Sequence, residues 1–177
     1  MDKNIEFIFV EFPNGSQPAL ETIISIGQLG IQGDPFYYDL GTYIRKGLLS
    51  LEETGIPEWH LVNDYRLVEI TSKGYKVTFN LLKRLDYNFP LIEFRINWRY
   101  SPADPVDQGV AFRMILFTHE EESTQYVLFT DAVIKTERSS SEFKQIAEAS
   151  YLIYQDFKKD PSKYLGGEKV EQETENV

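Results

Sequence analysis

Four neighbouring segments in the second half of the chain set its architecture: IEFRINWRY (residues 92–100), GVAFRMILFT (109–118), TQYVLFTDAVIKT (124–136) and SSSEFKQIAEASYLIYQDF (139–157). In the first segment, apolar residues at 92, 94, 96 and 98 alternate with polar ones, which is typical of a strand with one buried face. The second is apolar on both faces apart from one arginine, as a central strand is. Short connections favour antiparallel neighbours, so we expect a three-stranded meander followed by a helix.

Three cationic features interrupt this pattern. Arg95 and Arg113 lie inside strands, and the sequence Lys-Thr-Glu-Arg at residues 135–138 separates the third strand from the helix. Charged side chains are seldom buried in a sheet unless they are paired. These positions are therefore the first candidates for a functional site.

The chain before this stretch predicts a further strand and two helices. Residues 4–11 are β-branched and aromatic, as in a strand. A short helix begins at Pro18 and ends at Gly27 or Gly30. A second begins after Asp34, which can cap it, with Pro35 in the first helical position. Its apolar stripe predicts packing on the sheet. The stripe consists of Tyr37, Leu40, Ile44, Leu48 and Leu51.

Residues 65–82 predict a hairpin that turns at residues 72–74 (Ser-Lys-Gly). The basic pair Lys83 and Arg84 then leads into the first strand of the meander. The fold class is α+β: we expect an antiparallel sheet of about four to six strands with an N-terminal helix pair and a C-terminal helix. Ser139 and Glu142 have the spacing of a capping box at the start of that last helix.

The composition limits the kinds of function. With 177 residues, 42% of them hydrophobic, the chain can form one domain with its own core. It has no cysteine, which excludes disulfides, thiol catalysis and cysteine-based metal sites. The formal net charge is −10, so nucleic acid is repelled unless cations cluster locally. No histidine cluster or glycine-rich phosphate loop is present, so we expect no metal and no cofactor.

The expected domain organisation is simple. A single domain covers residues 1–160, with an insertion at 60–75, and a flexible acidic tail covers 161–177. The apolar runs are too short to cross a membrane. The first residues resemble a strand rather than a signal peptide, so we expect a cytoplasmic location.

The order of these elements resembles the RelE superfamily, and most closely its phage-derived HigB-type branch. The resemblance rests on four short motifs and covers most of residues 4–160. The motifs are Glu93-Phe94-Arg95, Ala111-Phe112-Arg113-Met114-Ile115, Ala132-Val133-Ile134-Lys135-Thr136, and Glu142-Phe143 with Ala147.

This resemblance implies a RelE-like fold and a toxin of a toxin–antitoxin system. Such a toxin is a ribosome-dependent mRNA endoribonuclease in which the ribose 2′-OH attacks the adjacent phosphate without a metal. The reaction needs a group that takes the 2′-OH proton, positive charge near the phosphorus, and an acid for the leaving oxygen. The implied partners are a cognate antitoxin, the ribosome and mRNA.

The resemblance also selects the candidate site residues. Arg95, Arg113 and Lys135 are the candidate catalytic residues, because a guanidinium can hold two phosphate oxygens and stays charged. The candidate RNA-binding residues are Lys83, Arg84, Arg138 and Tyr151. Neither His60 nor His119 has a convincing base partner, so the general base is not identified.

Structural interpretations stay open beside these roles. Arg113 can pair with Asp131 on the neighbouring strand, and Arg95 can face solvent. Lys135 and Arg138 can belong to a solvated helix entry, and Tyr151 can be a packing residue.

A different function is the alternative: a non-catalytic binding or regulatory protein of phage or mobile-element origin that keeps the RelE-like fold. The net charge favours it, as does the absence of a second lysine before Thr136 and of an arginine after Ala147.

Overall fold

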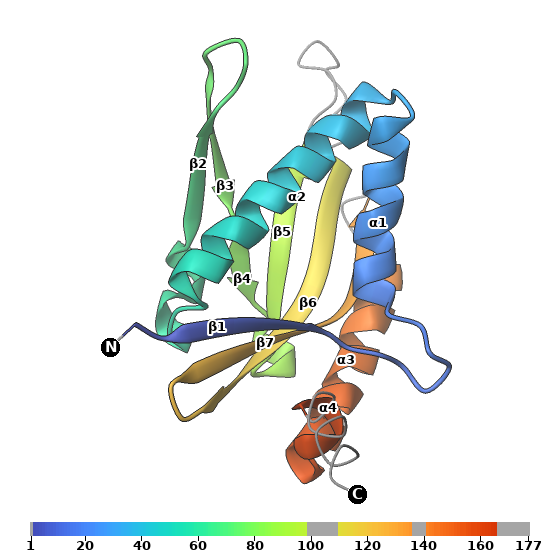
Figure 1. Ribbon diagram of the computed structural model, residues 1–177, viewed down its shortest axis with the longest axis vertical. Coiled ribbons are helices and arrows are strands. Elements are labelled where there is room, and N and C mark those ends of the chain that lie inside the picture. The colour runs from blue at the N-terminus through green and yellow to red at the C-terminus, as the bar shows by residue number, and fades with distance from the viewer. Residues whose placement is uncertain (1, 99–109, 136–140, 166–177) are drawn as a thin grey trace, which may run out of the picture.

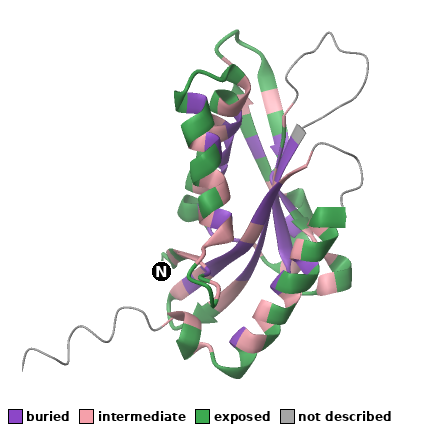
Figure 2. Ribbon diagram, turned by 90° about the vertical axis from the view of Figure 1, so that its right-hand side faces the viewer, coloured by how far each residue is buried: buried purple, intermediate pink, exposed green. Residues whose placement is uncertain are grey.

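A central sheet lies between two helical layers, with α1 and α2 on one side and α3 on the other (Figures 1 and 2). The computed structural model describes residues 2–98, 110–135 and 141–165. In chain order the elements are β1 (Asn4–Phe9), α1 (Pro18–Ile31), α2 (Pro35–Thr54), η1 (Trp59–Asp64), β2 (Arg66–Ile70), β3 (Lys76–Asn80), β4 (Leu82–Arg84), η2 (Asp86–Asn88), β5 (Ile92–Trp98), β6 (Val110–Glu121), β7 (Thr124–Lys135), α3 (Ser141–Lys159) and α4 (Ser162–Leu165). The predicted α+β class is confirmed.

The main sheet has five strands in the order β1-β7-β6-β5-β4. Strands β5, β6 and β7 form the predicted antiparallel meander. Strand β1, however, pairs in parallel with β7, with Phe7 beside Val127. The sheet is therefore mixed, and the prediction of a wholly antiparallel sheet was wrong. Alternation of side chains shows which face of a strand is buried but not the direction in which it runs, so the sequence could not reveal this.

The predicted hairpin is confirmed. Strands β2 and β3 pair antiparallel, and the turn between them contains Gly74 at φ +83°. They form a separate two-stranded sheet (Figure 1). The chain then passes into β4 through Leu81, whose carbonyl oxygen accepts a hydrogen bond of 2.9 Å from the backbone N–H of Arg95.

The helix pair begins largely as expected. The Asp34 carboxylate accepts hydrogen bonds from the backbone N–H groups of Phe36 and Tyr37, which confirms the predicted cap. Helix α1 runs for 14 residues, so it is longer than predicted and continues past Gly27 and Gly30. A Cβ atom at Gly30 would lie 2.8 Å from the Cα of Tyr38. Gly30 therefore allows α2 to approach α1 closely and does not end the helix. The predicted cap residue Ser139 lies outside the described residues.

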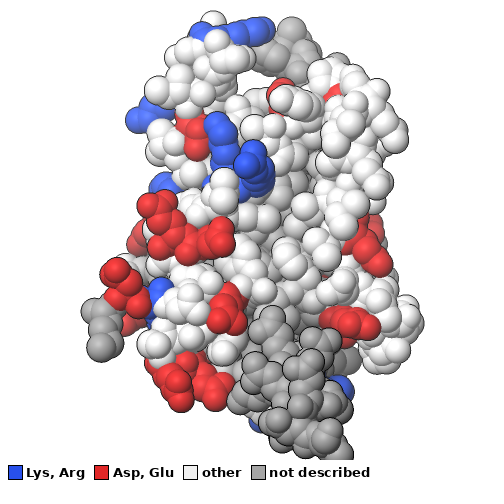
Figure 3. All heavy atoms as spheres, viewed as in Figure 1, with Lys and Arg blue, Asp and Glu red and all other residues white. Residues whose placement is uncertain are grey.

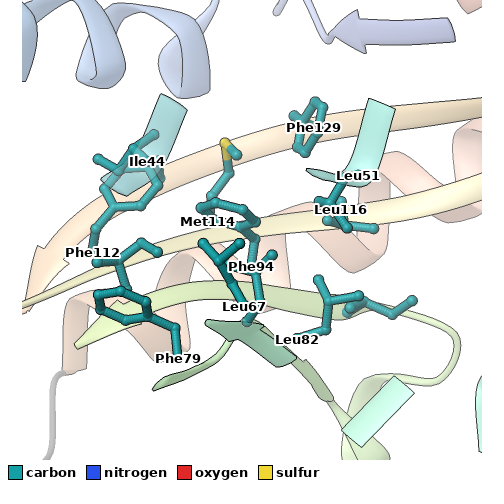
Figure 4. Close-up of a cluster of buried hydrophobic side chains, with 14 of the residues drawn as sticks. Ile44, Leu51, Leu67, Phe79, Leu82, Phe94, Phe112, Met114, Leu116 and Phe129 are labelled. Carbon is teal, nitrogen blue, oxygen red and sulfur yellow. The ribbon is translucent and has the colours of Figure 1, made fainter. Parts of the chain in front are cut away.

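Each face of the sheet has its own core cluster. The first lies between the sheet and the helix pair, and Figure 4 shows α2 side chains such as Ile44 meeting Phe94, Phe112 and Met114. Gly47 belongs to this contact, because a Cβ there would lie 2.9 Å from Phe94. The second cluster lies between the sheet and α3. Its buried members are Val10, Leu91, Ile115, Phe117, Leu128, Ala147 and Phe157.

Candidate functional site

Helix α3 covers part of its face of the sheet with apolar contacts, and the rest of that face is charged. Under the helix lie side chains of the second core cluster, such as Phe117 and Leu128. Further along the same strands, no helix among the described elements covers the sheet (Figure 2). We call this part the charged half-face. Its members are Lys83, Glu93, Arg95, Arg113, Asp131 and Lys135.

Strand alternation puts these side chains on one side. Phe94 and Phe112 belong to the first core cluster, so Glu93, Arg95 and Arg113 point to the opposite face. The strand register then aligns them. Lys83 pairs with Glu93, and Arg95 stands directly opposite Arg113. Lys135 pairs with Ala111, one step diagonally from Arg113. The charges therefore form a row across β4, β5, β6 and β7.

A β-bulge marks the boundary between the two parts of this face. The register between β6 and β7 shifts between Ile115 and Leu116. The hydroxyl of Thr130 contacts Ser150 of α3 at 2.6 Å and donates to the carbonyl oxygen of Ile115 at 3.2 Å. Its neighbour Asp131 comes next, where the charged half-face begins. A bulge turns consecutive side chains to one side of a sheet, which is how both residues face α3.

Arg113 is held in a nearly buried ion pair. Its Nε lies 2.6 Å from Oε1 of Glu93, and the two side chains are 12% and 6% exposed. Arg113 therefore pairs with Glu93 on β5, and the alternative of a pair with Asp131 was wrong. Burial lowers the pKa of Arg113, Glu93 opposes this effect, and Arg95 adds to it. The guanidinium still carries its charge, because its pKa starts far above neutral pH.

Arg95 is half-buried and anchored to the backbone. Its Nε donates a hydrogen bond of 3.0 Å to the carbonyl oxygen of Asn80. Its two terminal nitrogens have no hydrogen-bond or ion-pair partner among the described residues. A guanidinium fixed through Nε presents those terminal groups in a set direction, which is the geometry that a phosphate needs.

The lysines of the row differ in burial. Lys83 is exposed, whereas Lys135 is half-buried. Burial lowers the pKa of Lys135, and the nearby positive charges of Arg113 and Lys83 lower it further against the effect of Glu93. Within the described ranges neither lysine forms an ion pair. Lys135 is thus a cation whose proton is easier to remove than that of an ordinary lysine.

Asp131 is the second carboxylate of the charged half-face. One of its oxygens accepts a hydrogen bond of 2.8 Å from the backbone N–H of Ala132. Burial raises the pKa of Asp131; the hydrogen bond lowers it, and Glu142 in the first turn of α3 raises it. No cation in the described part of the chain pairs with it.

The structure separates the remaining candidates from this row. Arg84 lies with its guanidinium 5.8 Å from the ring centre of Trp59, and its Nε is 3.7 Å from Asp86. Tyr151 packs on the second core cluster, 6.3 Å from the Tyr154 ring. Arg138 lies outside the described residues. Of the seven candidates, Lys83, Arg95, Arg113 and Lys135 come together.

Sequence reasoning missed the partner of Arg113. Glu93 stands two residues before Arg95, on the same face of the same strand, and that alternation was visible. The missing information was the register of β5 against β6, which brings Glu93 within reach of Arg113. The sequence indicated Asp131 only as a possible ion-pair partner of Arg113, and not as a member of the site in its own right.

Two further observations concern sites of other kinds. Among the residues that the structure describes, no group of three or more metal-ligating side chains could hold a metal ion. Within the same residues, no helix is long and apolar enough to cross a membrane.

No protein-family model matches the chain, and no curated protein or solved structure matches it significantly.

Proposed function

We propose that the protein is a HigB/RelE-like toxin, an endoribonuclease that cleaves ribosome-bound mRNA and binds phosphate on the charged half-face. The observation that carries this proposal is the cross-strand pair of Arg95 and Arg113. Like charges directly opposite one another destabilise a sheet. Two opposed arginines on central strands therefore lower the stability of the folded state, and a bound anionic ligand would offset this loss.

The side chains take different roles in this reaction. Arg95 holds the scissile phosphate through its terminal nitrogens, and Arg113 adds positive charge behind it. A water molecule takes the 2′-OH proton as the 2′-oxygen attacks phosphorus, the bond from phosphorus to the 5′-oxygen breaks, and Lys135 donates a proton to that leaving oxygen. The lowered pKa of Lys135 suits a proton donor. The products are a 2′,3′-cyclic phosphate and a free 5′-hydroxyl.

The partners follow from the same proposal. The ribosome presents the mRNA, and a cognate antitoxin blocks the charged half-face. The charged half-face carries four cations and two carboxylates, so its net charge is positive. An antitoxin segment with acidic side chains would be attracted to it. No metal ion is required, since guanidinium and ammonium groups supply the positive charge.

The test is induced expression followed by analysis of cellular mRNA. Wild-type protein is expected to arrest growth and to truncate messages that are being translated. Arg95→Gln should weaken cleavage by about 10²-fold or more, as expected on removal of one charge-stabilising donor. If wild-type protein neither arrests growth nor cleaves mRNA in a translation extract, the proposal fails.

A second candidate function has one specific observation in its favour. Arg113 already has a carboxylate partner at 2.6 Å and is nearly buried, so one of the two opposed arginines is engaged within the fold. This favours a non-catalytic binding protein that uses Arg95, Lys83 and Lys135 to hold an acidic partner. Tight binding of RNA or of an acidic peptide without cleavage would select this function.

A further inference from the structure

A groove of about 750 Å³ lies between α2 and the tip of the β2–β3 hairpin, away from the charged half-face. Its size is in the range of ligand sites. Four aromatic side chains, two lysines and several hydroxyl groups line it. The lining residues that matter here are Tyr38, Tyr43, Lys46, Lys73, Tyr75 and Trp98.

The aromatic side chains form a base and a rim. At the base, the rings of Tyr43 and Trp98 pack with centres 4.7 Å apart, and Tyr43 also contacts Phe79 at 5.0 Å. At the rim, Tyr38 is 63% exposed and Tyr75 is 69% exposed. Exposed rings on two separate elements that line one groove offer flat apolar surfaces on which a planar group can stack.

The surroundings of the groove are basic, although the chain is acidic. Residues 38–46 and 69–77 contain four cations and two carboxylates, a local charge of +2 in a chain of −10. Figure 3 shows Lys and Arg gathered over α2 and the hairpin, with Asp and Glu prominent on the other half of that face. Lys46 pairs with Glu69 at 2.9 Å, whereas Lys73 at the hairpin tip has no ion-pair partner among the described residues.

We propose that this groove binds single-stranded RNA, with bases stacked on Tyr38 and Tyr75 and the backbone phosphates near Lys73. Aromatic rings beside cations are the combination that single-stranded nucleic acid requires, because every base has a flat face and every linkage carries a charge. A neutral peptide would use the rings but not the local charge of +2. The groove therefore has an occupant of defined chemistry.

This inference rests on RNA being the ligand of the proposed function, but it does not require cleavage. Trp98 at the groove and Arg95 on the charged half-face belong to the same strand, but their side chains point to opposite faces of the sheet, because Trp98 packs against the first core cluster. An RNA strand that reaches both places must therefore pass around the sheet, and a short oligonucleotide in the groove does not contact Arg95. The groove then holds the RNA at a distance from the cleavage site and contributes to affinity rather than to chemistry.

Trp98 provides a direct readout. The chain has two tryptophans, so Trp59→Phe leaves Trp98 as the sole tryptophan and keeps an aromatic ring at position 59. The probe is a 2′-O-methyl oligoadenylate of about six nucleotides, a typical length for one stacking site. It has no 2′-OH nucleophile and cannot be cleaved. We expect saturable quenching of Trp98 emission that weakens steeply with salt.

Variants of the rim test the assignment. Tyr38→Ala and Tyr75→Ala should each weaken binding by about ten-fold, in line with the loss of one base–aromatic stack. Lys73→Gln should weaken binding and flatten its salt dependence. The matched control is Tyr87→Ala, which removes a fully exposed tyrosine that does not line the groove. Anisotropy of a labelled oligonucleotide gives the same affinities in the unaltered Trp59 background if Trp59→Phe does not fold.

The outcomes separate the groove from the proposed cleavage. Arg95→Gln should weaken cleavage in a translation extract by about 10²-fold or more but leave the quenching by the methylated oligonucleotide largely intact. If the wild type shows quenching but no cleavage, the proposed nuclease activity is ruled out and the proposed RNA binding in the groove is retained. No saturable quenching, or equal losses for Tyr87→Ala and the rim variants, would overturn the groove proposal.

Discussion

The two parts of the sheet face that α3 adjoins are built from the same strands but differ in chemistry. Under the helix, Phe117 and Leu128 pack with Phe157, and the buried Thr130 hydroxyl is satisfied by Ser150. Beyond the bulge, β5, β6 and β7 carry Arg95, Arg113 and Lys135. On their opposite face the same strands are apolar on both sides of the bulge. A row of charges is therefore not a general feature of this sheet but is confined to the charged half-face.

This difference shows which residues serve stability and which are available for a ligand. The part under α3 is closed by apolar area and satisfied hydroxyl groups. The charged half-face has one internal ion pair, between Glu93 and Arg113, and its other charges have no ion-pair partner in the described part of the chain. Substitutions on either side of the bulge test this difference.

Glu93→Ala should have the largest effect on stability, because it leaves Arg113 buried without its partner. Removing one member of a buried pair costs about 3–5 kcal/mol in the free energy of unfolding. Chemical denaturation measures this change. Lys83→Ala, at the exposed position opposite Glu93, is the matched control and should change stability by less than about 0.5 kcal/mol. A loss under about 1 kcal/mol for Glu93→Ala would mean that Arg113 is not held as described.

On the other side of the bulge, Thr130→Val should cost about 1–3 kcal/mol, because the buried Ser150 hydroxyl loses its partner. The double variant Thr130→Val with Ser150→Ala should recover part of that loss, since neither hydroxyl is then left unsatisfied. A double-mutant cycle by thermal or chemical denaturation gives the coupling. Additive losses would contradict the direct contact between these two hydroxyl groups.

Arg95→Gln should leave stability unchanged or raise it by up to about 0.5–1 kcal/mol, because it removes a like charge opposite Arg113. The gain should shrink at high salt. Denaturation at two salt concentrations measures it, with Asn97→Gln on the same strand as control. A clear loss of stability would show that Arg95 serves the fold and would weaken the case for a ligand.

Asp131→Asn should have the smallest effect. Burial raises the pKa of Asp131, so the native state holds its proton more tightly than the unfolded chain does. The ionised carboxylate therefore reduces stability as the pH rises from the ordinary value of 3.8 through the raised pKa. Asparagine can keep the hydrogen bond to Ala132, so the variant should be slightly more stable at neutral pH and should lack this pH dependence. Greater stability of the wild type at neutral pH would indicate a cation paired with Asp131.

Much of the fold could be predicted from residue patterns. The meander, the hairpin and the Asp34 cap each depend on local signals, namely alternation, a glycine turn and a capping side chain. The parallel pairing of β1 with β7 could not be predicted, because it depends on how a distant strand joins the sheet. The aromatic groove could not be predicted either, since α2 and the hairpin are brought together by tertiary packing.

The candidate site shows the same division between features with local sequence signals and features set by tertiary packing. The strand arginines were visible as exceptions to an apolar pattern, but their relation to each other was not. The register between β5 and β6 puts Arg95 opposite Arg113. It also brings Glu93, rather than Asp131, into an ion pair with Arg113. A shift by one residue would have sent these side chains to the apolar face.

The most direct test of the central claim compares mRNA cleavage by wild-type protein, Arg95→Gln and Lys83→Gln in a translation extract. The account predicts cleavage products ending in a 2′,3′-cyclic phosphate for the wild type. It predicts a loss of about 10²-fold or more for Arg95→Gln and a much smaller loss for the peripheral Lys83→Gln. Absence of cleavage by the wild type, or equal cleavage by wild type and Arg95→Gln, would contradict a phosphate-binding role for the charged half-face in cleavage.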